Sequence, residues 1–224
     1  MELSLLATDY DGTLADDGAV SETALAALSR WKASGRRAVL VTGRRLPDLE
    51  LVCPHLGAFD AIVAENGALL HLPGQTRRLA EPSPPALGDA LRARGVTPLA
   101  FGEVIVAALS TEEDAVREAL ADAGSDWAIS LNKDSLMLLP PGVDKASGLA
   151  AALWALGAKA ADTLGVGDAE NDLPFLGACE VSAAVANALP TVKAAANIVT
   201  RAPAGAGFAE LVDGVLAGEF AAAV

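Results

Sequence analysis

The sequence predicts an α/β protein with a doubly wound parallel sheet and a small inserted α/β domain. Short apolar runs of strand length recur at residues 3–7, 37–42, 60–64 and 162–166, and stretches with helical spacing separate them. Two of these runs end in acidic clusters, as at the carboxyl edge of a parallel sheet that binds a ligand. Proline clusters bound a central segment, 81–140, which is therefore expected to be an insertion.

Composition narrows the class of protein. The chain has 224 residues, with 52% apolar and 20% charged residues, which is typical of a compact globular protein. No apolar run approaches the roughly 18 residues that a membrane helix needs, and no basic segment precedes the first strand, so we expect a cytoplasmic protein without a membrane partner. The net charge of −13 argues against binding to nucleic acid.

The first predicted strand, 3–7, leads into two carboxylates separated by one residue, Asp9 and Asp11, followed by Gly12 and Thr13. Gly12 suggests a sharp turn directly after the strand. Two carboxylates so close together repel each other, and a cation between them relieves that repulsion. The stretch therefore predicts a cation site at the mouth of the sheet.

The next elements follow in order. A helix begins after Ser21, its expected N-cap, and ends at Gly35. The strand 37–42 ends in Thr42-Gly43-Arg44, where a hydroxyl and a glycine suit close approach to a phosphate. A helix is expected over 46–56, a strand over 60–64 followed by Glu65-Asn66-Gly67-Ala68, and a β-hairpin over 69–79.

The inserted segment and the closing part continue the alternation of helices and strands. The insertion is predicted to contain a helix over 86–94, a strand over 103–109, a helix from 111, and strands over 127–131 and 135–139 joined by a polar turn with Lys133. Lys145 precedes a helix over 146–156, and the strand 162–166 leads to Gly167-Asp168-Ala169-Glu170-Asn171-Asp172. A short strand, a helix, a short strand and a closing helix are expected after that.

Four of these motifs together resemble the haloacid dehalogenase-like (HAD) phosphohydrolases. The strings that carry the resemblance are LLATDYDGTL, TGR, the lysine at 145 and GVGDAENDLPFL, in the order of that family. The string ENGA at 65–68 resembles the Cof-type branch. The resemblance implies a Rossmann-like catalytic core over 1–80 and 141–224, with 81–140 forming the cap domain.

The resemblance also implies roles for individual residues. Asp9 would be the nucleophile and Asp11 the general acid and base. The phosphoryl group would be bound by Thr42, Gly43, Lys145 and Asn171. Mg²⁺ would be held by Asp9, Asp168 and the backbone carbonyl of Asp11, with Asp172 orienting a water molecule or binding the ion. Contacts to the rest of the substrate are expected from Arg44, Asn66 and Lys133, the last because it is a cation on a polar turn of an acidic protein.

These roles predict a Mg²⁺-dependent phosphatase that forms an aspartyl-phosphate on a small phosphorylated metabolite, such as a sugar phosphate or phosphoglycolate. A phosphotransferase or phosphomutase with the same intermediate stays open, because the motifs do not separate it from a hydrolase. A receiver-type domain is about half as long and has no cap, and a non-catalytic binding protein is disfavoured because no motif residue is missing. The protein is expected to be a monomer or a homodimer.

Overall fold

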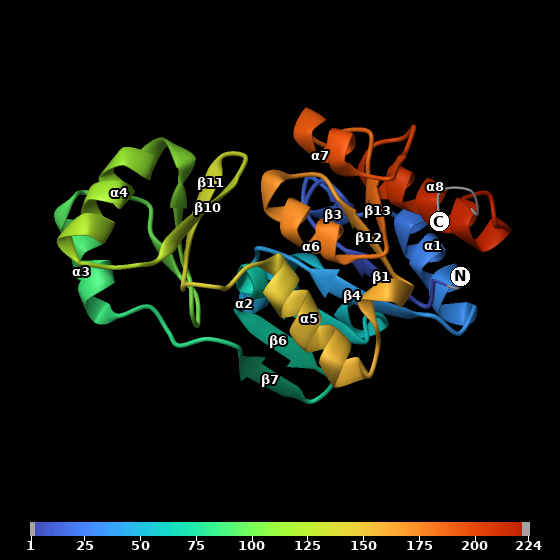
Figure 1. The fold of residues 1–224 in the computed structure, drawn as a ribbon, viewed down its shortest axis with the longest axis horizontal. Coiled ribbons are helices and arrows are strands. Elements are labelled where there is room, and N and C mark those ends of the chain that lie inside the picture. Colours follow the sequence, from blue (N-terminus) through green and yellow to red (C-terminus); the bar gives the residue numbers. More distant parts are fainter. Residues whose placement is uncertain (1–2, 221–224) are drawn as a thin grey trace.

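The structure is a computed structural model that describes residues 3–220, so the first two and last four residues of the expected core segments lie outside it. Two lobes with separate sheets make up the molecule (Figure 1). Within the described residues, the larger lobe has an eight-stranded sheet and the smaller one a four-stranded sheet. This arrangement confirms the predicted fold class.

The large sheet is parallel except at one edge. Its strands are, in spatial order, β14 (Ile198–Val199), β13 (Val181–Ala184), β12 (Thr163–Gly167), β1 (Leu5–Thr8), β4 (Arg37–Val41), β5 (Ala61–Ala64), β6 (Leu69–Leu72) and β7 (Gln75–Arg78). All pairs up to β5 are parallel, whereas β6 and β7 form the predicted antiparallel hairpin. Every residue of β1 is buried, because helices cover both faces of a doubly wound sheet.

Helices cover both faces of this sheet. They are α1 (Glu22–Ala33), α2 (Leu46–Val52), α5 (Lys145–Leu156), α6 (Leu173–Ala178), α7 (Pro190–Ala195) and α8 (Ala204–Ala217). The connection through α1 runs from β1 to β4, whereas the connection through α5 runs the other way, from β5 to β12. Right-handed crossovers therefore place α1 and α5 on opposite faces. α8 packs against α1, and α6 packs against α5 (Figure 1).

The smaller lobe is an α/β layer with its own apolar core. Its antiparallel sheet has the order β10 (Ala128–Asn132), β11 (Ser135–Leu139), β9 (Val106–Leu109) and β8 (Ala100–Phe101). The helices α3 (Pro85–Ala93) and α4 (Glu113–Asp122) pack side by side (Figure 1). Leu87, Leu91, Val116 and Leu138 are buried in the core between these helices and the sheet.

Several elements of the structure differ from the sequence prediction. The helix expected over 46–56 ends at Val52, because Pro54 has no backbone N–H and disfavours a helical conformation at Cys53. The strand expected over 103–109 begins only at Val106. A hairpin of β2 (Ala15–Asp16) and β3 (Ala19–Val20) follows the first motif and was not predicted, although Asp17-Gly18 carries the positive φ angles of its turn.

Thiols and membrane spans are two further features of the described residues. Cys53 is a buried free thiol, and Cys179 is a partly buried one. Among residues 3–220, no helix is both long and apolar enough to cross a membrane.

Candidate active site

The predicted site residues meet at the carboxyl edge of the large sheet. Asp9 follows β1, Thr42 follows β4 and Asp168 follows β12, which are three neighbouring parallel strands. The sheet ladder fixes the first two, since the Asp9 N–H donates to the carbonyl of Val166 (3.0 Å) and the Thr42 N–H to that of Val63 (2.8 Å). The sequence prediction that separate motifs share one edge is therefore matched by the topology.

Three buried aspartates form a cluster at this edge. One carboxylate oxygen from each of Asp9, Asp168 and Asp172 lies within 4.8 Å of the others. The Asp172 carboxylate turns back toward β12 and accepts the backbone N–H groups of Asp168 (2.8 Å) and Ala169 (3.0 Å). A Cβ at Gly167 would stand 2.6 Å from the Asp172 Oδ2, so this close approach requires glycine.

Lys145 stands between two of these carboxylates. It is the first residue of α5, and a capping box between Asp144 and Ser147 fixes the start of the helix. Its Nζ donates to the Oδ1 of Asp9 and to the Oδ1 of Asp172, both at 2.6 Å. Burial alone would lower the pKa of Lys145, but Asp172 and Asp9 raise it above its ordinary value. The lysine is therefore a permanent positive charge beside Asp9.

The three carboxylates of the cluster would nevertheless carry more negative charge than its two contacting lysines, Lys145 and Lys133, balance. Burial and the neighbouring Asp172 raise the pKa of Asp9 well above its usual value, although Lys145 opposes the shift. Burial also raises the pKa of Asp168 despite the contact with Lys133. A cation would stabilise the ionised carboxylates. Buried carboxylate oxygens are the ligands that Mg²⁺ prefers, so the donor set fits this ion.

Asp11 lies apart from the cluster. Both of its carboxylate oxygens accept from Arg44, at 2.7 Å each, and its side chain is 38% exposed. The backbone turns sharply at Gly12, as predicted, with a φ of 80°. A Cβ there would lie 2.4 Å from the Asp168 carboxylate, so Gly12 lets the chain pass directly over the cluster.

The smaller lobe contributes a cation to the same place. Lys133, in the turn between β10 and β11, brings its Nζ to 2.5 Å from the Asp168 Oδ2. Met137 on β11 packs against Gly43, where a Cβ would lie 2.7 Å from the Met137 Cε. The tip of this hairpin therefore covers the acidic cluster.

Two asparagines complete the buried polar floor. The Asn171 Nδ2 donates to the Asn66 Oδ1 (3.0 Å), and Asn66 donates in turn to the Met137 Sδ (3.1 Å). The Oδ1 of Asn171 is buried and has no hydrogen-bond partner among the described residues. Such an orphaned acceptor is costly, which is consistent with a ligand or a water molecule at this position.

A cavity of about 410 Å³ opens between the two lobes above these residues. Asp9, Asp11, Gly43, Arg44 and Lys133 line it on both sides, together with Arg45, Asp48, Ala100, Ile105, Ala107, Asn132, Asp134, Ser135 and Met137.

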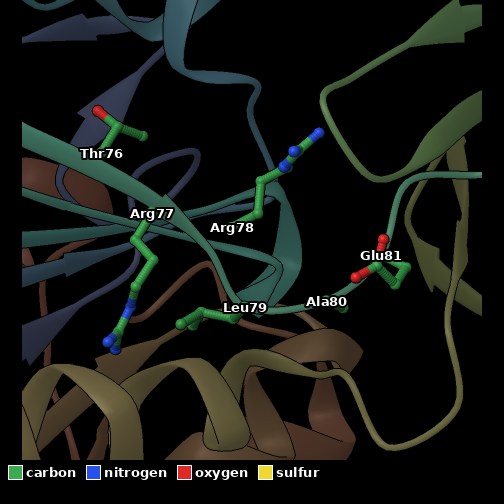
Figure 2. Close-up of a pocket in the computed structure, with 6 residues that line it drawn as sticks. All are labelled: Thr76, Arg77, Arg78, Leu79, Ala80 and Glu81. Carbon is green, nitrogen blue, oxygen red and sulfur yellow. The ribbon is translucent and has the colours of Figure 1, made fainter.

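A second hollow, of about 480 Å³, lies along the edge strand β7 and is lined by residues 76–81. Figure 2 shows Arg77 and Arg78 pointing to opposite sides of this strand. None of its lining residues belongs to the acidic cluster, so we assign the chemistry to the cavity between the lobes.

Sequence reasoning missed two residues that the structure brings to this region. Arg45 lines the cavity and is held by a bidentate ion pair with Asp48, at 2.6 and 2.8 Å. Glu65 is buried behind the cavity and receives backbone N–H groups from the smaller lobe. Arg45 follows the TGR motif directly, and Glu65 begins the ENGA string, so both stand next to motifs that were recognised.

Comparison with known proteins agrees with this geometry. The sequence profile of the haloacid dehalogenase-like hydrolases matches residues 6–81 and 100–212. The chain belongs to this family. The phosphoglycolate phosphatase of Methanothermobacter thermautotrophicus is 31% identical over 213 residues, which cover 92% of this chain and 96% of that protein.

Solved structures share the two-lobed fold. A haloacid dehalogenase-like hydrolase from Bacteroides thetaiotaomicron has a TM-score of 0.82 at 19% identity, over 96% of this chain and 100% of that one. The HAD subclass IIB sugar phosphatase BT4131 has a TM-score of 0.75 at 20% identity, over 88% and 93% of the two chains. The smaller lobe thus takes the place of the cap, and the protein is a HAD-type phosphatase.

Proposed function

We propose that this phosphatase hydrolyses a small phosphorylated acid, with phosphoglycolate as the first candidate, through an aspartyl-phosphate on Asp9 and with Mg²⁺ as cofactor. The observation that carries the proposal is the convergence of Asp9, Lys145, Asp168 and Asp172 at one edge of the sheet. It supplies a nucleophile and a fixed positive charge in a buried site, together with carboxylates for a cation.

In the first half-reaction, an Asp9 oxygen attacks phosphorus as the bond from phosphorus to the leaving oxygen breaks. Lys145 holds Asp9 in place and can also bind a phosphoryl oxygen, since its ammonium group has three donors and uses two. The hydroxyl of Thr42 and the amide of Asn171 would bind other phosphoryl oxygens. Asp11 would give its proton to the leaving oxygen.

In the second half-reaction, Asp11 takes a proton from water as the water attacks phosphorus, and the bond to Asp9 breaks. Orthophosphate leaves, and both aspartates return to their starting states. Both Asp11 oxygens face Arg44 in the structure, so the carboxylate must turn from Arg44 to reach the substrate. Asp9, Asp168 and the Asp11 carbonyl would hold Mg²⁺, which stabilises the charge that develops on the phosphoryl oxygens.

Two findings support a small acid as the substrate. The relative from M. thermautotrophicus is a phosphoglycolate phosphatase, and this chain matches nearly the whole of its length. The cavity is small, and Lys133 and Arg45 of its lining are cations that suit a carboxylate. A sugar phosphate is the alternative, supported by the structural likeness to a sugar phosphatase.

Phosphate release from a panel of phosphomonoesters tests the proposal. With Mg²⁺, phosphoglycolate should be among the best substrates, and a chelator should abolish its hydrolysis. Asp9→Ala should form no phosphoenzyme, whereas Asp11→Asn should form one from p-nitrophenyl phosphate and hydrolyse it about 10²–10⁴ times more slowly than the unaltered enzyme. Full activity in excess chelator, or wild-type levels of phosphoenzyme in Asp9→Ala, would refute the proposal.

A further inference from the structure

One core side chain reaches into the backbone of the cap. Glu65 lies in a 3-10 turn directly after β5, and only 1% of it is exposed. Its Oε1 accepts the N–H of Glu103 (2.8 Å), and its Oε2 accepts those of Val104 (2.9 Å) and Ile105 (3.2 Å). Hydrogen bonds to an ionised carboxylate are about twice as strong as neutral ones.

The surroundings make this contact specific. Val104 and Ile105, which donate to Glu65, belong to an apolar cluster that both lobes build. Its members are Leu46, Ala64, Ala68 and Leu69 from the core and Val104, Ile105, Met137 and Leu139 from the cap. A Cβ at Gly102 would lie 2.5 Å from the Glu65 carboxyl atoms, so the cap segment approaches as closely as glycine allows. A buried carboxylate without these three donors would be strongly disfavoured.

The same residue is tied to the phosphate-binding end of β4. The Glu65 N–H donates to the carbonyl of Arg44, and the Asn66 N–H to that of Thr42, both at 3.0 Å. Glu65 and Asn66 have φ angles of 51° and 52°, a left-handed conformation that is unfavourable for residues other than glycine. Strained residues of this kind persist where the surrounding contacts hold them, and they occur often at functional sites.

The contact also accounts for the shortened strand β9. The N–H groups of residues 103–105 bind a carboxylate of the core and do not join a sheet ladder, so the cap strand begins at Val106. Ile105 and Ala107, in and just beyond this segment, line the cavity above Asp9. Arg45 adds a second contact, from its Nη1 to the carbonyl of Phe101 (3.0 Å).

We propose that Glu65 is a positioning residue that latches cap residues 102–105 onto the core and so holds the cap over the catalytic aspartates. Glu65 itself does not line the cavity, and its carboxylate oxygens face the cap backbone, so it acts on catalysis through the cap. The kinetic consequence rests on the proposed phosphatase function, whereas the latch itself is a contact between the two lobes.

The test compares Glu65→Gln with Glu103→Gln, which removes the same charge from an exposed side chain of the latched segment. A glutamine keeps the shape of Glu65, but its amide nitrogen opposes the backbone donors. Amide hydrogen exchange at 103–105 should become about tenfold faster in Glu65→Gln and stay unchanged in the control. kcat/KM for phosphoglycolate should fall about tenfold, mainly through KM, and that for p-nitrophenyl phosphate should change little.

Each readout can overturn the proposal. Unchanged exchange at 103–105 in Glu65→Gln would refute the latch whether or not the protein hydrolyses phosphoglycolate. Faster exchange combined with an equal loss of kcat on both esters and an unchanged KM would refute the positioning role. If the unaltered protein does not act on any ester in the panel, the proposed function fails, and the exchange result still decides the latch.

Discussion

At the scale of single residues, the site places charges where burial disfavours them. Asp9, Asp168 and Asp172 are buried within one cluster, and the pKa values of Asp9 and Asp168 are raised. An aspartate whose pKa is higher in the folded than in the unfolded protein lowers stability as pH rises through that interval. Ionisation of Asp9 and Asp168 should therefore lower the free energy of unfolding of the metal-free protein at neutral pH.

Asp168→Asn should relieve this cost. The amide is neutral and can still accept the hydrogen bond of Thr13, which lies 3.2 Å from the Asp168 Oδ1. We expect the metal-free variant to be more stable than the unaltered protein by about 1 kcal/mol at neutral pH, or about 2–4 °C in Tm. This difference in stability should disappear as pH falls toward the usual pKa of an aspartate, because Asp168 of the folded protein is then protonated and neutral, like the asparagine of the variant.

Thermal unfolding with and without Mg²⁺ provides the measurement. Mg²⁺ should raise the Tm of the unaltered protein, because an ion that binds only the folded state stabilises that state. It should have little effect on the Tm of Asp168→Asn, because that variant lacks one of the carboxylates proposed to bind the ion. An exposed acidic residue supplies the control, since Asp213→Asn should leave the response to Mg²⁺ unchanged. An undiminished Mg²⁺ response in Asp168→Asn would remove Asp168 from the metal site.

At the scale of elements, close packing of α5 on β5 sets the place of Lys145. Gly148, one turn into α5, lies against the strand, where a Cβ would stand 2.4 Å from the Val63 Cγ1 and 2.5 Å from the Gly67 Cα. A larger side chain cannot fit without moving the helix. The first turn of α5 would move with it, and that turn carries Lys145.

Gly148→Ala should therefore impair catalysis although alanine is the better helix former, by roughly 1 kcal/mol. We expect kcat/KM to fall about 10²-fold, the loss that a displacement of about 1 Å can cause. Gly177→Ala in α6 is the matched control, because no atom of residues 3–220 beyond its chain neighbours and its own helix backbone lies within 4 Å of its Cβ position. Wild-type kcat/KM in Gly148→Ala would show that the packing of α5 does not set the position of Lys145.

The elements also show what the sequence could predict. Buried parallel strands appear as continuous apolar runs, and acidic motifs follow two of them, so the sheet and the place of the candidate site at its edge were predictable. Val104 and Ile105 extended the apolar pattern of β9, yet they lie in a loop because Glu65 binds their N–H groups. That contact joins residues about 40 positions apart and leaves no local pattern in the sequence.

At the scale of the whole molecule, a protein of net charge −13 must bind an anion. The cavity provides local positive charge for the anion, because Arg44, Arg45 and Lys133 line it from both lobes. The pairing of these cations was not predictable from sequence, because Arg44 contacts Asp11 across the sheet edge and Lys133 reaches Asp168 from the cap. These ion pairs join residues that are far apart in the sequence, so they become visible only once the fold is known.

Lys133 is the only one of these three cations that the cap supplies, and its side chain is 44% exposed. We predict that it binds the carboxylate of phosphoglycolate, the substrate proposed above. Lys133→Met should lower kcat/KM for phosphoglycolate about 10–100-fold, which corresponds to the usual free energy of a hydrogen bond between charged groups. Ethyl phosphate has no carboxylate and should be affected much less, and Lys159→Met, which removes an exposed lysine from the core lobe, should leave both esters unaffected. An equal loss on both esters would mean that Lys133 serves the acidic cluster through Asp168 and does not select the substrate.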